Sequence, residues 1–178
     1  PTIFINEKKY KGKVNYKEFK KTLEKNLYMK FKNIEMIGFK SFSEKTNILF
    51  EKGLTGIVGP NGCGKSNIVE SLRWCMGETS ANSMRGSGME DVIFSGTSNK
   101  PSKNIAEVSI NLSNKSNSGP HQFKDFEEIE IRRKIEKDKG SKYFINDKEV
   151  RARDVQTFFA DLSTGAHSPS LISQGRIG

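Results

Sequence analysis

Cysteine, histidine and long apolar runs are all scarce in this sequence. Its 178 residues include two cysteines, Cys63 and Cys75, and two histidines, His121 and His167. Two cysteines are too few for a disulfide framework, which favours the reducing cytoplasm. The histidines lack the spacing of zinc ligands, so we expect no zinc site. No apolar run approaches the ~20 residues that cross a bilayer, so we expect no contact with a membrane.

Acidic residues are also fewer than basic ones, and the formal net charge is +9. Such an excess invites a nucleic-acid interpretation. Residues 1–28 hold eight lysines and three glutamates, 8 − 3 = +5, which leaves +4 for the remaining 150 residues. More than half of the excess therefore lies in a short front segment, and the global charge is poor evidence for DNA binding.

The most informative segment is Gly59–Ser66, which reads G-P-N-G-C-G-K-S. It fits the phosphate-binding loop pattern G-x-x-x-x-G-K-[ST] at every fixed position. An apolar run of strand type, 54–58, precedes it, and residues 66–76 have the pattern of a helix. A strand, a glycine loop and a helix in this order are the setting in which the pattern binds a nucleoside triphosphate.

The chemistry of phosphate binding explains this spacing. Glycines at 59, 62 and 64 allow positive φ angles, so that backbone N–H groups can surround one anion. Lys65 would supply charge to the β- and γ-phosphates, and the Ser66 hydroxyl would ligate Mg²⁺. The predicted nucleotide site comprises the loop and its rim: Gly59, Pro60, Asn61, Gly62, Cys63, Gly64, Lys65, Ser66 and Asn67.

Hydrophobic periodicity predicts an α/β fold around this loop. Asn146–Lys148 is typical of a hairpin turn. The segment 158–161 briefly resembles an apolar strand that ends in an acidic metal ligand, but the pattern of 154–162 is that of an amphipathic helix with core phenylalanines. Strands are predicted at 30–37, 46–50, 54–58, 91–94, 106–112, 128–135 and 142–145, and helices at 66–76 and 152–162.

The first 28 residues have a different character. We predict a strand at 2–5, a turn at 6–9, a return strand at 10–14, and a helix whose face carries Phe19, Leu23 and Leu27. A hairpin and one helix cannot enclose a core. The segment resembles the C-terminal end of DsbA-like thiol oxidoreductases of the thioredoxin fold, but it lacks a C-x-x-C centre, so no redox activity is implied. We expect residues 1–28 to be a thioredoxin-like C-terminal fragment, a fusion or read-through segment, or a gene-boundary artefact, and we expect Met29 to be the true start.

Residues 29–178 resemble the N-terminal lobe of the SMC head domain, a P-loop NTPase of the ABC-ATPase type with a mixed sheet. The resemblance rests on four stretches in order: G-F-K-S-F at 38–42, G-P-N-G-C-G-K-S-N at 59–67, M-R-G at 84–86 with M-E-D-V-I-F at 89–94, and S-L-I-S-Q-G-R-I at 170–177. It implies a role for Gln174 in holding Mg²⁺ and the attacking water, with Lys65 as the other catalytic residue. It also implies that Lys40, Ser41 and Arg85 lie near the nucleotide.

The same resemblance implies that ATP and Mg²⁺ are the cofactors and that DNA is the polymer on which the protein acts. The partners would be a second SMC head, the C-terminal lobe of the same head and a kleisin-type subunit. The function would be chromosome condensation and partition, with sister chromatid cohesion, in the cytoplasm at the nucleoid. The signature motif and the Walker B acidic pair are not found in these 178 residues, so we expect this part alone to be nearly inactive as an ATPase.

Two other functions remain open from the residues alone. A self-sufficient kinase or GTPase would need a base-reading motif, which Asn114–Asn117 approaches without its final carboxylate. A DNA-binding module without enzymatic activity could use the basic stretch that contains Arg132, Arg133, Lys134, Lys137, Lys139 and Lys142. A solvated, lysine-rich strand face is the simpler interpretation of that stretch.

Overall fold

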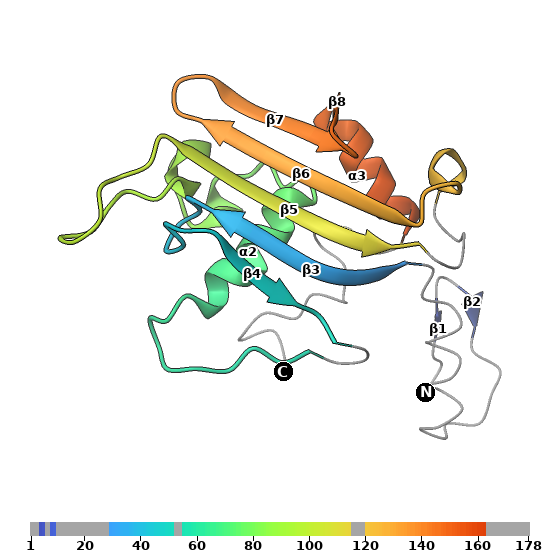
Figure 1. The fold of residues 1–178 in the computed structure, drawn as a ribbon, viewed down its shortest axis with the longest axis horizontal. Helices are drawn as coiled ribbons and strands as arrows, with labels where there is room; N and C mark the ends of the chain where they lie inside the picture. Colours follow the sequence, from blue (N-terminus) through green and yellow to red (C-terminus); the bar gives the residue numbers. More distant parts are fainter. Residues whose placement is uncertain (1–3, 6–7, 10–28, 52–54, 115–119, 163–178) are drawn as a thin grey trace.

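A computed structural model describes residues 4–5, 8–9, 29–51, 55–114, 120–162 of the chain. Within these ranges the main body is a six-stranded sheet in the order β4-β3-β5-β6-β7-β8, and every pairing in it is antiparallel. Figure 1 shows the long central strands crossing the molecule with both helices on one side. The strands are β3 (Lys30–Ile37), β4 (Thr46–Leu49), β5 (Ile105–Ser113), β6 (Glu128–Glu136), β7 (Gly140–Ile145) and β8 (Lys148–Val150).

The alternation of side chains along the central strands explains how the sheet presents an apolar face to the helices that the structure describes. On β6, the even positions Glu130 and Arg132 are half-buried, while Ile129 and Ile131 are fully buried. Because successive side chains point to opposite faces, the apolar set faces the helices and the polar set faces solvent. The β7–β8 hairpin turns through Asn146 and Asp147, both with positive φ, as a two-residue turn requires.

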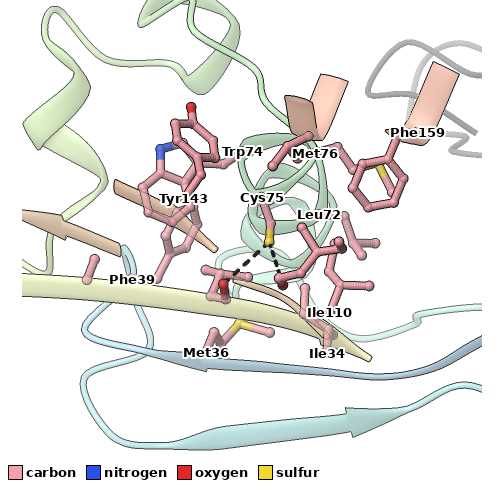
Figure 2. Packing of buried hydrophobic residues seen from close by; sticks show 14 of the residues in the cluster. Ile34, Met36, Phe39, Leu72, Trp74, Cys75, Met76, Ile110, Tyr143 and Phe159 are labelled. Atoms are coloured by element: carbon pink, nitrogen blue, oxygen red, sulfur yellow. Dashed lines mark hydrogen bonds between the residues drawn. The ribbon is translucent and has the colours of Figure 1, made fainter. Parts of the chain in front are cut away.

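Two helices cover the inner face of the sheet. Helix α2 (Lys65–Cys75) lies against β5 and β6, and α3 (Ala152–Asp161) lies against β7. Figure 2 shows Leu72 and Cys75 of α2 pointing toward the sheet, with Trp74 beside Phe39 and Tyr143. Each fully buried side chain of this size contributes about 1.5–3 kcal/mol by leaving water. The core therefore fixes the helix that follows the glycine loop.

A buried arginine joins the C-terminal end of α2 to the sheet. Arg133 on β6 is 2% exposed, and its Nη1 donates hydrogen bonds to the carbonyl oxygens of Trp74 (2.8 Å) and Glu78 (2.7 Å). Its guanidinium also lies over the rings of Trp74 and Tyr143, at 4.3 Å and 4.6 Å from their centroids. Trp74 lies in the last turn of α2 and Glu78 just beyond it, so this cation complements the helix dipole and joins the helix end to the chain that follows.

Most predicted elements are confirmed, with boundaries shifted by one or two residues. The predicted helices at 66–76 and 152–162 are α2 and α3, and the α/β class is confirmed, although the described strands pair only in antiparallel fashion. The phenylalanines of α3, Phe158 and Phe159, are buried, as expected for core residues.

The strand predicted at 54–58 is wrong for the residues that the structure describes. Residues 55–60 have no regular secondary structure, and Val58 is 92% exposed. A strand exists only by hydrogen bonding to a neighbour, and none of the described strands pairs with this segment. The apolar composition of this segment therefore predicted a strand that residues 55–58 do not form.

The strand predicted at 91–94 is also wrong. A short 3-10 helix, η2 (Met89–Val92), ends there, and Ile93 forms only an isolated bridge with Phe39. The Asp91 carboxylate accepts hydrogen bonds from the backbone N–H groups of Ser87 (2.6 Å) and Gly88 (2.9 Å). This local side-chain bonding favours a turn over a strand.

The front segment is described only in part. Strands β1 (Phe4–Ile5) and β2 (Lys8–Lys9) pair in antiparallel fashion, so the expected hairpin is present, but its return strand begins within the segment predicted as the turn. Residues 10–28, which include the predicted helix, lie outside the described residues.

The two neighbouring arginines of β6 provide a test of this architecture. We expect Arg133→Met to lower the free energy of unfolding by about 2–4 kcal/mol, because two buried carbonyl groups lose a charged donor. Arg132→Met, on the exposed face of the same strand, should cost less than about 1 kcal/mol. Urea denaturation of both variants measures the difference. Equal losses would contradict the role of Arg133 at the end of α2.

Candidate functional site

The glycine loop leads directly into α2, and the side chain of Lys65 folds back onto the backbone of the loop. Lys65 Nζ donates hydrogen bonds to the carbonyl oxygens of Gly59 and Pro60, each at 2.6 Å. The backbone N–H groups of residues 62–66 have no hydrogen-bond partner among the residues that the structure describes. A row of unpaired N–H groups at a helix N-terminus is the arrangement that binds phosphate.

Glycine is required at two points of this loop. Gly62 and Gly64 have φ angles of 84° and 91°, which other residues rarely adopt. A Cβ at Gly64 would also lie 2.9 Å from Ser41 Oγ and 3.5 Å from the ring of Phe42. The expectation of positive φ is confirmed for these two glycines, whereas Gly59 is not in the left-handed region.

The turn at 38–42 is held against residues 92–94 by backbone hydrogen bonds. Phe39 and Phe42 exchange hydrogen bonds, and Lys40 N donates to the carbonyl oxygen of Val92 (2.7 Å). Gly38 has a φ of 65°, and a Cβ there would come within 2.1 Å of the carbonyl oxygen of Ile105. Only glycine allows this close approach, so the G-F-K-S-F stretch is positioned by its first residue.

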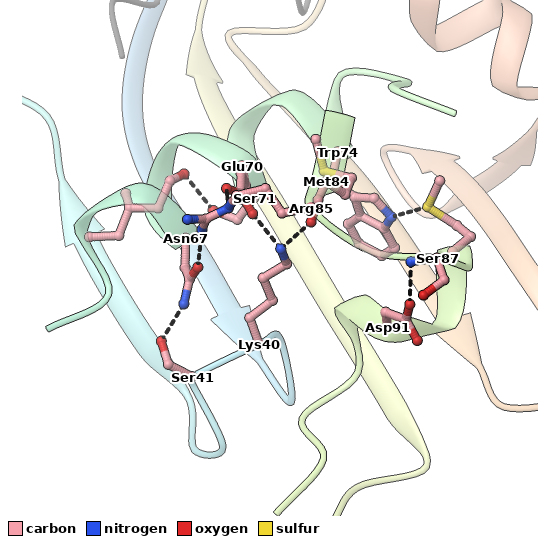
Figure 3. Close-up of polar contacts among 12 residues, drawn as sticks. Lys40, Ser41, Asn67, Glu70, Ser71, Trp74, Met84, Arg85, Ser87 and Asp91 are labelled. Atoms are coloured by element: carbon pink, nitrogen blue, oxygen red, sulfur yellow. Dashed lines mark hydrogen bonds and ion pairs between the residues drawn. The ribbon is translucent and has the colours of Figure 1, made fainter. Parts of the chain in front are cut away.

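One buried carboxylate joins two predicted site residues. Glu70 of α2 is 6% exposed, and it forms ion pairs with Lys40 through Oε2 and with Arg85 through Oε1. Lys40 Nζ also donates to the carbonyl oxygen of Met84, immediately before Arg85. Figure 3 shows the three side chains meeting between α2 and the two loops.

A second set of polar contacts extends this network to the loop rim. Arg85 Nη2 donates to Asn67 Oδ1 (2.8 Å), and Asn67 Nδ2 donates to Ser41 Oγ (2.8 Å). These bonds link the turn at 38–42, the first turn of α2 and the Arg85 loop. The network is visible in Figure 3 from Ser41 to Met84.

The Arg85 loop is shaped by Asp91 and lines an open polar pocket. The backbone N–H groups of Gly88 and Ser87 donate to this carboxylate, and they hold the pKa of Asp91 below its ordinary value. The pocket has a volume of about 580 Å³ and is lined by Asn82, Arg85, Gly86, Ser87 and Asp91. The φ of Arg85 is 54°, so this side chain is presented from a left-handed backbone.

The structure therefore brings the predicted residues Lys40, Ser41, Asn67 and Arg85 together beside the glycine loop. Cys63 and Ser66 are exposed on the loop and on the first turn of α2. Gln174 lies outside the described residues. Sequence reasoning missed Glu70. The available signal was its position three residues after Asn67, which places both side chains on the same helix face.

The features behind the two alternative functions have structural roles here. Asn114 is buried, and its Nδ2 donates to the carbonyl oxygens of Phe123 (3.0 Å) and Phe126 (2.9 Å), so its side-chain amide is engaged by the fold. In the basic stretch, Arg133 is buried and Arg132 pairs with Asp147 at 2.6 Å. Lys139 and Lys142 pair with Glu136 and Glu149. Neither alternative is favoured by these contacts.

Within the described ranges, no cluster of three or more histidine, cysteine or acidic residues could hold a metal ion. None of the helices in the same ranges is long and apolar enough to span a membrane. A Mg²⁺ ion bound through one hydroxyl and nucleotide phosphates needs no such protein cluster, and an exposed Ser66 on the first turn of α2 fits that kind of ligand.

The fold and the loop define a P-loop ATPase head. The family described as RecF/RecN/SMC N-terminal domain matches residues 30–175, and the chain belongs to this family. The chromosome partition protein Smc of Cereibacter sphaeroides is 54% identical over 149 residues, and that of Bacillus subtilis is 42% identical over 149 residues. Each alignment covers 84% of this chain but only 13% and 12% of the respective relative.

Solved structures agree with this assignment. An Smc head domain from Pyrococcus furiosus, bound to the C-terminal domain of ScpA, superimposes with a TM-score of 0.72 at 34% identity, covering 78% of this chain and 34% of that one. A structure from work on ATP-driven dimerisation and DNA-stimulated activation of SMC ATPases has a TM-score of 0.70 at 34% identity and covers 76% and 80%. RecF bound to ATP, at 21% identity and a TM-score of 0.54, shares the fold.

The two cysteines should differ sharply in reactivity. Burial raises the pKa of the Cys75 thiol to about 12, and its Sγ contacts the carbonyl oxygens of Val108 and Ile131 (Figure 2). At pH 8 this thiol is neutral, with a thiolate fraction of about one in ten thousand. Cys63 is exposed on the loop.

We expect an aromatic disulfide reagent at pH 8 to label only Cys63 in the folded protein and both cysteines after denaturation. Cys63→Ser should abolish the native reaction, and Cys75→Ala should leave it unchanged. Absorbance of the released thiolate measures the reaction. Rapid native labelling of Cys63→Ser would show that the core around Cys75 opens.

Proposed function

We propose that this chain is the ATP-binding half of an SMC-type ATPase that organises and partitions chromosomes on DNA. The observation that carries the proposal is the glycine loop Gly59–Ser66, with unpaired N–H groups at residues 62–66 and Lys65 at the start of α2. The family match and the Smc relatives support it. In the whole protein, ATP held between two heads would couple hydrolysis to movement on DNA.

Each residue has a defined part in nucleotide binding. The loop N–H groups would donate hydrogen bonds to the phosphate oxygens, and the positive end of α2 would attract their negative charge. Lys65 would exchange its two carbonyl partners for β- and γ-phosphate oxygens, and the Ser66 hydroxyl would hold Mg²⁺ together with Gln174. The bound metal ion would neutralise charge that develops on the phosphates. Lys40, Ser41, Asn67 and Arg85 would form the rim of the site.

The remaining partners follow from the relatives. Structures of related heads show ATP-driven dimerisation and binding of ScpA, a kleisin-type subunit. We propose that this chain likewise pairs with a second head, the C-terminal lobe of its own head and a kleisin, and that it acts at the nucleoid in the cytoplasm. The opposing head would complete the catalytic site, because the signature motif is not found in this sequence.

Binding without turnover is the distinctive expectation for these 178 residues. We expect the chain to bind ATP with Mg²⁺ and Lys65→Ala to weaken binding by at least about tenfold, since a charged phosphate partner is lost. Turnover should stay well below ~1 s⁻¹, the low end for common enzymes. Fluorescence titration and a phosphate-release assay measure the two quantities.

The same titrations separate the alternatives. Strong preference for GTP over ATP in competition would instead favour a stand-alone GTPase. Steep loss of duplex DNA affinity with salt, in a chain that binds no nucleotide, would favour a DNA-binding module. Glu149→Gln, which removes a charge from the surface pair with Lys142, is the control for Lys65→Ala and should bind ATP as the unmodified chain does.

A further inference from the structure

Glu70 occupies an unusual position for a carboxylate on a helix that faces a core. Its side chain is 8% exposed, and each of its oxygens is bonded to a different cation. Burial of a carboxylate is costly unless it is paired and hydrogen bonded. Lys40 and Arg85 meet that requirement from two separate loops, so the three charges form one connected unit (Figure 3).

Both cations reach Glu70 from strained backbone. The φ angles of Lys40 and Arg85 are 47° and 54°, in the left-handed region that residues other than glycine rarely occupy. Such conformations persist only where surrounding contacts determine them, and they concentrate at functional sites. Here both deliver a positive side chain to the same carboxylate.

The environments of the two cations differ. The Lys40 side chain is 12% exposed and is fully engaged with Glu70 and the carbonyl oxygen of Met84. The Arg85 side chain is 57% exposed and uses Nε for Glu70 and Nη2 for Asn67. A guanidinium has five donor hydrogens, and Nη1 of Arg85 has no partner among the described residues. The Arg85 guanidinium is thus held through Nε and Nη2, while Nη1 is available to a ligand.

We propose that Glu70 is a positioning residue of the phosphate site, which holds Arg85 in place beside the glycine loop before an anionic ligand binds. Lys40 balances the second carboxylate oxygen and ties Glu70 to the Arg85 loop through Met84. Because a long side chain that is already ordered loses less entropy when a ligand arrives, this arrangement increases affinity. The inference rests on the proposed nucleotide function of the loop.

The test is a double-mutant cycle on ATP–Mg²⁺ affinity in the 178-residue chain, measured by fluorescence titration. We expect Glu70→Gln and Arg85→Ala each to weaken binding by roughly tenfold. The double variant should be weaker than Arg85→Ala by less than about twofold, because Glu70 acts through Arg85. Glu70→Asp, which retains the carboxylate, should recover most of the loss.

Two variants separate positioning from charge and from stability. Arg85→Lys keeps the charge on an exposed side chain, so the protein stays folded, but an ammonium cannot bond Glu70 and Asn67 in the planar manner of a guanidinium. We expect it to bind ATP as weakly as Arg85→Ala. Glu149→Gln removes one negative charge from the far edge of the sheet and should bind ATP as the unmodified chain does.

Three results would overturn the inference: unchanged or tighter ATP binding by Glu70→Gln, additive losses in the cycle, or full affinity of Arg85→Lys. Tighter binding would mean that the carboxylate competes with phosphate for the cations. The proposed function would fail as well if the unmodified chain did not bind ATP, or if Lys65→Ala left ATP affinity unchanged. The Lys65 result therefore distinguishes the failure of one proposal from the failure of both.

Discussion

Helix α2 lies with its apolar face against β5 and β6, and the phosphate loop, Glu70 and the Arg133 contact all take their positions from this packing. Leu72, Trp74 and Cys75 are buried in the central core. Because the helix cannot rotate without exposing them, its first two turns present Asn67 and Glu70 in a fixed direction. At its other end, Arg133 donates hydrogen bonds to the carbonyl oxygens of Trp74, in the last turn, and of Glu78, just beyond the helix.

Charge is distributed differently on the two sides of the sheet. On the outer face, Arg132 lies among Glu107, Glu130 and Asp147, so its charge is balanced by acidic neighbours. Near the loop, Glu70 faces two cations, and Lys65 adds a third. The local excess of positive charge therefore lies beside the loop, where an anionic ligand would gain most from it.

The candidate site is assembled from three separate segments: the turn at 38–42, the first turns of α2 and the loop around Arg85. Side-chain hydrogen bonds among Ser41, Asn67 and Arg85 connect them. Such a site couples the nucleotide loop to a surface loop with an open polar pocket. The hydrogen bonds from Ser41 through Asn67 to Arg85 form a continuous path from the turn at 38–42 to this pocket.

Local chemistry alone determined a large part of this protein. The glycine pattern fixed the loop, since positive φ at Gly62 and Gly64 and a following amphipathic helix require no distant partner. Alternating apolar and polar residues predicted the central strands, because one face of each of these strands is buried. The resemblance to the SMC head was carried by motifs in a fixed order, and the residues that it named, Lys40, Ser41 and Arg85, lie next to the first turns of α2.

Only the tertiary structure decided which residues connect these parts. A strand at 54–58 needs a hydrogen-bonding neighbour, and composition cannot supply one. Arg132 and Arg133 are adjacent and chemically identical, but the pleat sends one to solvent and the other under Trp74. In the sequence, nothing distinguishes Glu70 from other helix glutamates. In the structure, two distant loops bring cations to its carboxylate oxygens. The free energy of a buried charge depends on neighbours that are distant in the sequence, and the sequence alone does not show which residues these are.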